Sequence, residues 1–223
     1  MNNSNQDMPL NTNENYIPIS VLIAKRALDI LAALFGLSIG LCLLPFLALL
    51  IKLDSKGPIF FSQLRVGQVT PDTSKMFSMY KFRTMRLDAE AATGAVLASK
   101  NDPRITRIGR FLRLTRLDEI PQLYNVLKGD MSLIGPRPER PDFYKKLEDA
   151  IPFFTERTWG LKPGITGLAQ VNQGYDECIE DVRSKVSFDH AYALSLSSFF
   201  SWIRADINIV VKTVVVMVCG RGQ

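Results

Sequence analysis

The sequence is poor in the residues on which several common classes of catalytic site depend. His190 is its only histidine, so a Ser–His–Asp or Cys–His mechanism would rest on one residue, and a histidine-based zinc site is disfavoured. The three cysteines lie far apart and form neither a metal-ligand spacing nor a disulfide framework (Cys42, Cys178 and Cys219). These absences favour a reducing compartment and a site built from other side chains.

Glycine-rich nucleotide motifs are missing as well, since the sequence contains no P-loop and no dinucleotide fingerprint. Bases are in excess, with 27 Lys and Arg against 22 Asp and Glu, which gives a net charge of +5. The first twenty residues hold Asp7 and Glu14 and no base, so the rest of the chain carries +7. This excess favours phosphate esters, acidic lipid or nucleic acid as partners, and the scarcity of aromatic residues among the arginines disfavours nucleic acid.

Residues 1–20 are polar, rich in asparagine and without periodicity, which predicts a disordered tail. They lack the basic start and the short apolar stretch of a signal peptide. The chain has 223 residues, 47% of them hydrophobic, so the remainder is long and apolar enough for one compact domain.

The strongest single feature is a run of 22 residues without a formal charge, from Ile30 to Ile51. As a helix this run would be about 33 Å long, close to the thickness of the hydrocarbon core of a bilayer. We therefore expect a membrane helix over residues 21–52. The alternative, a buried helix of a soluble domain, is disfavoured by this length.

Two signals indicate that this helix enters and leaves the membrane by the same face. Ser38, Gly40 and Pro45 lie within the run, and proline removes a backbone hydrogen bond and clashes with the preceding turn, which predicts a bend. Bases flank the run on both sides (Lys25, Arg26, Lys52 and Lys56). A bent, re-entrant helix puts both basic flanks in the cytoplasm, whereas a straight span would satisfy the positive-inside rule at one end only.

Residues 53–223 have a mixed pattern that predicts an α+β cytoplasmic catalytic domain, mostly helical with a small β element. Alternation over residues 77–85 predicts a strand with Lys81 and Arg83 on one face. Helical spacing over residues 117–128 ends at Gly129, and residues 162–167 have the composition of a loop.

Three further helices are expected in the second half of the chain, over residues 141–150, 176–195 and 199–219. The last of these is apolar but contains Arg204, Asp206 and Lys212. Those charges argue against a second membrane span and predict an amphipathic helix that lies at the bilayer surface.

The adjacent acids Asp118 and Glu119 are the main candidates for chemistry. One interpretation is that they cap the helix over residues 117–128 and complement its dipole. The other is a site for Mg²⁺ and phosphate, because bases that match phosphate geometry surround the pair in the sequence (Lys81, Arg83, Arg113 and Arg137). A carboxylate beside the metal, here Asp118, could also be a nucleophile.

Four segments resemble the bacterial sugar transferases, the monotopic polyprenyl-phosphate phosphoglycosyl transferases. They are KRALD, YKFRTM, TRLDEIPQLYNVLKGDMSLIGPRPE and KPGITGLAQVN, and they occur here in the family's order between about Lys25 and Lys212. The chain is similar to the short catalytic form. The GPRPERPDF segment and the later Gln-Gly-Tyr run resemble the branch that transfers a hexose 1-phosphate. Leu168 replaces the family's usual tryptophan, and Leu44-Pro45 replaces its usual Ser-Pro pair.

The resemblance implies that a UDP-sugar gives its sugar 1-phosphate to undecaprenyl phosphate and releases UMP, the first membrane step of surface polysaccharide or glycoconjugate assembly. It places the nucleophile at Asp118, which forms a phosphosugar intermediate with Mg²⁺ nearby, and an orienting or proton-accepting partner at Glu119. Lys81, Arg113 and Arg137 match its phosphate-binding bases. It also implies an enzyme at the cytoplasmic face of the bacterial inner membrane; a homodimer is left open.

Two other functions are compatible with the residues alone. One is a Mg²⁺-dependent hydrolase acting on a lipid phosphate, which would release free sugar phosphate. The other is a membrane-tethered module that binds anionic lipid through its arginines, which would not need the acid pair.

Overall fold

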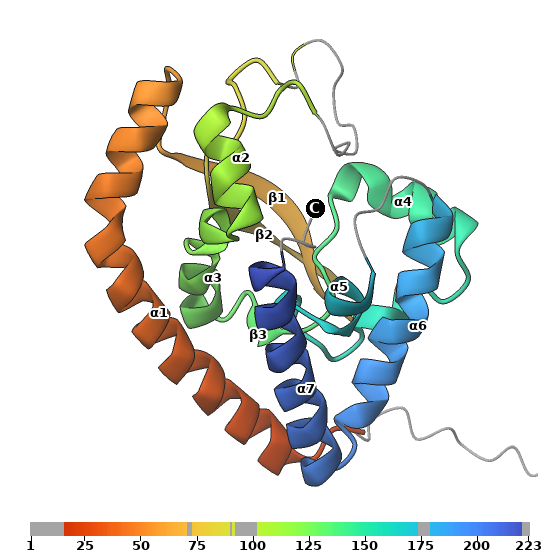
Figure 1. Cartoon of the computed structure of the whole chain (residues 1–223). Coiled ribbons are helices and arrows are strands. Elements are labelled where there is room, and N and C mark those ends of the chain that lie inside the picture. Colours follow the sequence, from red (N-terminus) through yellow and green to blue (C-terminus); the bar gives the residue numbers. More distant parts are fainter. Residues whose placement is uncertain (1–15, 71–72, 90, 92–101, 174–178, 220–223) are drawn as a thin grey trace, which may run out of the picture.

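The computed structural model describes residues 16–70, 73–89, 91, 102–173 and 179–219. Its first element is the helix α1 (Ile19–Asp54), which Figure 1 shows as a long curved rod along one side of the molecule. Residues 1–15 of the expected tail lie outside the described part, while Ile17 is buried and the helix begins at Ile19. By length and composition, α1 is the one helix among the described residues that could cross a membrane, and only 17% of its most apolar window is buried.

The helix α1 is continuous through Ser38, Gly40 and Pro45, so its backbone bends without an interruption in helical structure. Most of its large apolar side chains are exposed, among them Leu31, Phe35, Leu41, Phe46 and Leu49. Entry and exit by one membrane face remains a prediction at this point.

Two small sheets lie within the domain. The strands β1 (Phe60–Val69) and β2 (Ser74–Phe82) form an antiparallel pair, and β2 confirms most of the strand expected over residues 77–85. The strands β3 (Ser132–Ile134) and β4 (Gly164–Thr166) pair in parallel. The expectation of a loop over residues 162–167 was wrong for Gly164–Thr166. These three residues form β4 because their backbone groups pair with β3, about thirty residues earlier in the chain.

The expected helices are present, with shifts at their ends. They are α3 (Gln122–Lys128), α4 (Pro141–Ala150), α6 (Ile179–Ser195) and α7 (Phe199–Val218), and the structure adds α2 (Arg107–Leu114) and α5 (Leu168–Asn172). Short 3₁₀ turns η1 (Leu117–Glu119) and η2 (Glu156–Thr158) complete the described elements. The chain is therefore a mixed, mostly helical α+β protein.

One charge of the last helix, Asp206, forms contacts inside the domain. Asp206 on α7 accepts hydrogen bonds from Tyr192 Oη over 2.8 Å and Trp202 Nε1 over 2.7 Å, and Lys25 of α1 lies 3.5 Å from it. Tyr192 and Trp202 are fully buried in a core that joins α1, α6 and α7. This core, which also includes Ile209 of α7, fixes the first and last helices to each other. Many other apolar side chains of α7 are exposed (Phe200, Ile207, Val210, Val211, Val214, Val215 and Val218).

Candidate active site

The two acids lie in the 3₁₀ turn η1, between α2 and α3. The turn follows Arg116, whose backbone has a φ of 58°, in the left-handed region. Asp118 and Glu119 are 5% and 8% exposed. The helix α3 has Pro121 as its N-cap and no side-chain cap, so the capping interpretation of the pair was wrong.

Lys81 joins the strand β2 to both acids. Its Nζ lies 3.0 Å from Glu119 Oε1, to which it donates a hydrogen bond, and 3.9 Å from Asp118 Oδ2. The residues are 38 positions apart in the chain, and the fold brings them together because β2 packs directly on η1. The structure therefore places Lys81 beside the acid pair, and its expected role in binding phosphate stays a prediction.

Glu119 is held as a carboxylate by three bases. Arg116 Nη1 lies 3.5 Å from its Oε2, and the charge of Arg137 also acts on it. Burial favours the neutral acid, but the charges of Lys81, Arg116 and Arg137 together outweigh this effect and lower the pKa of Glu119 to about 2. Glu119 is therefore anionic at any physiological pH and is a weak base.

Asp118 has the opposite character. Burial raises its pKa above the usual range for aspartic acid, and the attraction of Lys81 offsets only part of this effect. Within the described part of the chain its carboxylate accepts no hydrogen bond and has the longer, 3.9 Å contact to Lys81. Of the two acids, Asp118 therefore has the less engaged oxygens and the higher proton affinity.

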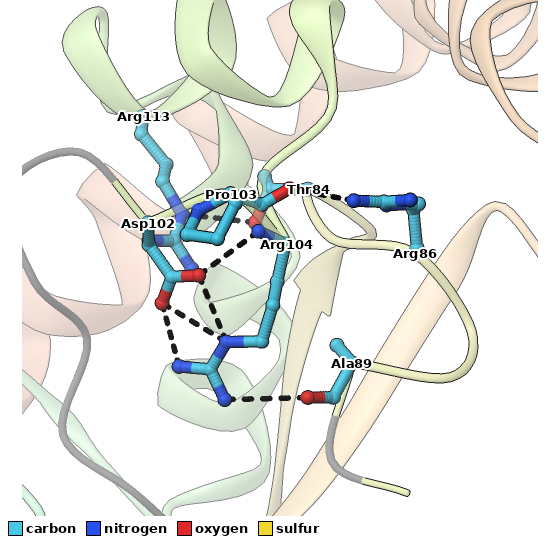
Figure 2. A network of polar contacts seen from close by, with 7 residues as sticks. All are labelled: Thr84, Arg86, Ala89, Asp102, Pro103, Arg104 and Arg113. Carbon is cyan, nitrogen blue, oxygen red and sulfur yellow. Dashed lines mark hydrogen bonds and ion pairs between the residues drawn. The ribbon is translucent and has the colours of Figure 1, made fainter. Parts of the chain in front are cut away.

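Arg113 lies beside the acids on α2. Its Nε donates to Thr84 Oγ1 over 3.0 Å, and its charge acts on both Asp118 and Asp102. Figure 2 shows this side chain next to a second pair, in which Arg104 binds both oxygens of the buried Asp102. The sequence did not predict a role for Thr84 or Asp102 near the acids. Their contacts with Arg113 and Arg104 form only because the fold brings the segments around residues 84 and 102 together.

Arg83 is not brought to the acids. It follows the end of β2 and is 5% exposed, and its guanidinium binds the carbonyl oxygens of Ser55 (2.6 Å) and Lys56 (2.9 Å) at the end of α1. The expected shared face with Lys81 is absent because the alternation of a strand stops where β2 stops. Arg83 thus binds the segment that directly follows the C-terminal end of α1.

The helix α1 packs directly behind the acids. A methyl carbon added at Gly36 would lie 2.6 Å from Cδ1 of Leu123, and one added at Gly40 would lie 2.6 Å from Cγ2 of Ile120. Ile120 follows Glu119 in the chain. Gly40, expected at a helix break, is therefore a point of close approach between α1 and the segment that carries the acids.

The donor set suits Mg²⁺ bound together with a substrate. Among the described residues no group of three or more His, Cys, Asp or Glu could enclose a metal ion. Mg²⁺ commonly takes one or two carboxylates and completes its shell with phosphate oxygens and water, and Asp118 has oxygens free of hydrogen bonds for this purpose. The residues present therefore fit the ion.

Comparison with known proteins decides the family. The family model for the bacterial sugar transferases matches residues 20–220, which is nearly the whole chain. The chain belongs to the bacterial sugar transferase family. The matched range includes α1, the acid pair and the turn that carries Arg137, so the site described above lies within the family's common region.

Individual relatives share much of this sequence. The UDP-N-acetylgalactosamine-undecaprenyl-phosphate N-acetylgalactosaminephosphotransferase of Aeromonas hydrophila is 43% identical over 205 residues, which are 92% of this chain and 46% of that protein. The UDP-glucose:undecaprenyl-phosphate glucose-1-phosphate transferase of Escherichia coli (strain K12) is 39% identical over 194 residues, 86% of this chain and 39% of that protein.

A shorter relative matches over nearly its full length. The exopolysaccharide production protein PSS of Rhizobium leguminosarum bv. phaseoli is 41% identical over 199 residues, 87% of this chain and 94% of that protein. The chain thus spans less than half of the first two relatives and almost all of the third.

Proposed function

We propose that this chain transfers a sugar 1-phosphate from a UDP-sugar to undecaprenyl phosphate and releases UMP, as the first membrane step of surface polysaccharide or glycoconjugate assembly. The observation that carries the proposal is the buried pair Asp118–Glu119 with Lys81 in contact with both acids, packed against a membrane-type helix in a member of the sugar transferase family. Relatives named for this reaction supply the two substrates.

Asp118 is the proposed nucleophile. A carboxylate oxygen of Asp118 attacks the phosphorus next to the sugar, the bond from that phosphorus to UMP breaks, and the sugar phosphate stays on Asp118. A phosphate oxygen of undecaprenyl phosphate then attacks the same phosphorus and frees the carboxylate. Asp118 suits this role because its oxygens accept no hydrogen bond in the described part of the chain and its pKa is raised, so its carboxylate is the more nucleophilic of the two.

Glu119 is proposed to orient rather than to accept a proton. With a pKa of about 2 it is a poor base, and both of its oxygens are engaged by Lys81 and Arg116. It thereby fixes two cations beside Asp118. Lys81, Arg113 and Arg137 are then placed to bind the diphosphate, whose transfer depends mainly on positioning and charge neutralisation. When bound at Asp118, Mg²⁺ would supply further neutralisation of the phosphate oxygens.

Both ends of α1 are attached to one domain, which supports entry and exit by the same membrane face. Near the N-terminal end, Arg26 donates to the carbonyl oxygens of Val126 (2.6 Å) and Leu127 (2.8 Å). At the other end, Asp54 Oδ2 accepts a hydrogen bond from Ile108 N over 2.8 Å. A straight span would separate these ends by the full bilayer, so we propose a re-entrant helix with the domain at the cytoplasmic face of the bacterial inner membrane and α7 at the lipid surface.

The donor is proposed to be a UDP-hexose. The GPRPERPDF segment favours this branch, whereas Gly174 and Tyr175 of the Gln-Gly-Tyr run lie outside the described residues. Since the relatives include proteins named for N-acetylgalactosamine and for glucose, a screen of UDP-hexoses against UDP-N-acetylhexosamines for UMP release decides between them.

The test is UMP release from a UDP-sugar by the purified full chain with undecaprenyl phosphate and Mg²⁺. We expect release in the wild type, formation of a lipid-linked sugar phosphate, and loss of both in Asp118→Asn. Unfolding temperature should not fall in this variant, because an ionised Asp118 with a raised pKa destabilises the fold above that pKa. Asp142→Asn, an exposed acid in an ion pair with Arg140, is the matched control and should keep full activity.

Three outcomes would contradict the proposal. Full UMP release by Asp118→Asn would remove Asp118 as nucleophile. Free sugar phosphate without a lipid-linked product would instead indicate a hydrolase. Lipid binding that falls steeply with salt, survives loss of both acids and is accompanied by no turnover would indicate a binding module.

A further inference from the structure

The turn that carries Arg137 is held along its whole main chain. The carbonyl oxygens of the four consecutive residues 136–139 each accept a hydrogen bond from a different donor. Gly164 N donates to Pro136 O over 2.8 Å, and Val66 N donates to Glu139 O over 2.9 Å. Backbone groups of two different strands therefore secure the outer carbonyls.

Arginine side chains reach the two inner carbonyls. Arg157 Nη2 donates to the carbonyl oxygen of Arg137 over 3.3 Å, and Arg65 Nη1 donates to that of Pro138 over 3.1 Å. Arg65 comes from β1 and Arg157 from η2, so side chains of two separate elements bind the main chain of two adjacent residues. The hydrogen bonds and ion pairs described for the two arginines join them to other groups than Asp118 and Glu119.

Arg157 is itself fixed in one geometry. Its buried guanidinium has Nη1 2.7 Å from Asp189 Oδ2 and Nη2 3.7 Å from Glu139 Oε1, and it stacks 4.5 Å from the ring centre of Phe154. A buried ion pair of this kind adds little net stability, because desolvation cancels most of the attraction. The planar guanidinium instead provides a rigid fork with defined hydrogen-bond directions.

The backbone held by these bonds carries Arg137, one of the bases near the acid pair. Prolines on both sides of Arg137 restrict its backbone further, since their rings fix φ at 136 and 138. The charge of Arg137 acts on Glu119, which places the guanidinium within electrostatic range of the acid pair. A displacement of about 1 Å of such a group can reduce the rate of a positioned reaction by about a hundredfold.

We propose that Arg65 and Arg157 are positioning residues for Arg137: they hold the two carbonyl groups of the Arg137–Pro138 segment and so set where the Arg137 guanidinium meets the diphosphate of the donor. This inference rests on the proposed function. The two arginines do not touch the substrate, and Asp189 serves the same purpose by fixing Arg157.

The experiment is a double-mutant cycle on UMP release. Arg65→Met and Arg157→Lys are each made in the wild type and in the Arg137→Met background, and kcat and KM for the UDP-sugar are measured with the unfolding temperature. We expect kcat/KM to fall about 10- to 100-fold in the wild-type background. In the Arg137→Met background the same substitutions should cost less than about twofold, because the group they position is gone. Arg183→Met, which loses a comparable exposed bond to the Ala150 carbonyl, is the control and should leave activity unchanged.

If each substitution lowers kcat/KM by the same factor in the Arg137→Met background as in the wild type, the inference is overturned, since the arginines would then act on the fold in general. If Arg157→Lys fails to fold, Arg65→Met decides, because Arg65 is only half-buried and lies on a strand. A wild type that releases no UMP overturns the proposed function and this inference together. Equal factors in the two backgrounds of an active enzyme overturn the inference alone.

Discussion

The Nη2 atom of Arg83 lies 2.6 Å from the carbonyl oxygen of Ser55, one residue past the end of α1. The same atom lies 3.0 Å from Ser55 Oγ, and Nη1 donates to the Lys56 carbonyl over 2.9 Å. The last carbonyls of a helix lack partners within the helix, and Arg83 Nη2 also donates to one carbonyl of the last turn of α1, that of Ile51, over 3.4 Å. Arg83 therefore anchors the C-terminal end of α1 to the segment that follows β2.

Arg83→Gln should destabilise the chain without changing substrate affinity. We expect a loss of about 1–3 kcal/mol in the free energy of unfolding, because several hydrogen bonds to a charged group disappear. Thermal unfolding in detergent, beside KM for the UDP-sugar, measures both effects. Arg86→Gln, which removes a bond from an exposed arginine to the Pro103 carbonyl, is the control. A raised KM at unchanged stability would return Arg83 to the phosphate-binding set.

Lys81→Met should reduce UMP release by about 100- to 1,000-fold, the usual effect of removing one group that stabilises charge in the transition state. The loss has two parts, because Lys81 binds Glu119 directly and also attracts the Asp118 carboxylate. Lys75→Met on the same strand removes an exposed base and serves as the control. Equal activities of the two variants would exclude a role for Lys81 in the reaction.

The acid limb of the pH–rate profile should lie above the ordinary range of aspartic acid, which is about 4. Asp118 must be ionised to attack, and burial raises its pKa, so activity should fall as the pH drops through that raised value. Arg116→Met removes a charge that lowers this pKa and should move the limb to still higher pH. Arg110→Met, an exposed arginine on α2, should leave it in place. An acid limb below pH 4 would assign it to another group.

Gly40→Val should lower activity more than a lipid-facing substitution of similar size. The added carbons would collide with Ile120, which directly follows Glu119. We expect a loss of about 10- to 100-fold in kcat/KM from displacement of the acids. Ala32→Val, at an exposed position of the same helix, adds comparable volume and should have little effect. Equal behaviour of the two variants in UMP release and in unfolding would show that the contact at Gly40 is unimportant.

Several elements were predictable because their information is local. The helix expected over residues 141–150 corresponds to α4, which buries Leu147, and Gly129 ends α3 with a φ of 92°. The adjacent acids and the base Lys81 were predictable as a group from charge and residue type. The wrong predictions concerned residues whose structure depends on distant or neighbouring elements. The strand β4 forms only with a partner about thirty residues away, and Arg83 lies beyond the end of β2 and so does not share a face with Lys81.

Arg157 had no signal in the sequence at all. It is a single arginine among polar residues, and its importance comes from Asp189 on α6 and from the turn at Arg137. Asp29 belongs to the KRALD segment, but its partners had no signal: it accepts hydrogen bonds from Ser132 Oγ and Leu133 N and so attaches α1 to β3. Such residues become visible only when separate segments are placed side by side.

Because α1 is hydrogen-bonded to the rest of the domain at Arg26 and at Asp54, a helix inserted in lipid as proposed would rise or sink together with the domain. Any force on the helix from acyl chains of a different length would shift the carboxylates at 118 and 119 by a similar amount relative to the headgroups. The thickness of the surrounding lipid would then control how readily a long-chain acceptor and a water-soluble donor arrive at one height.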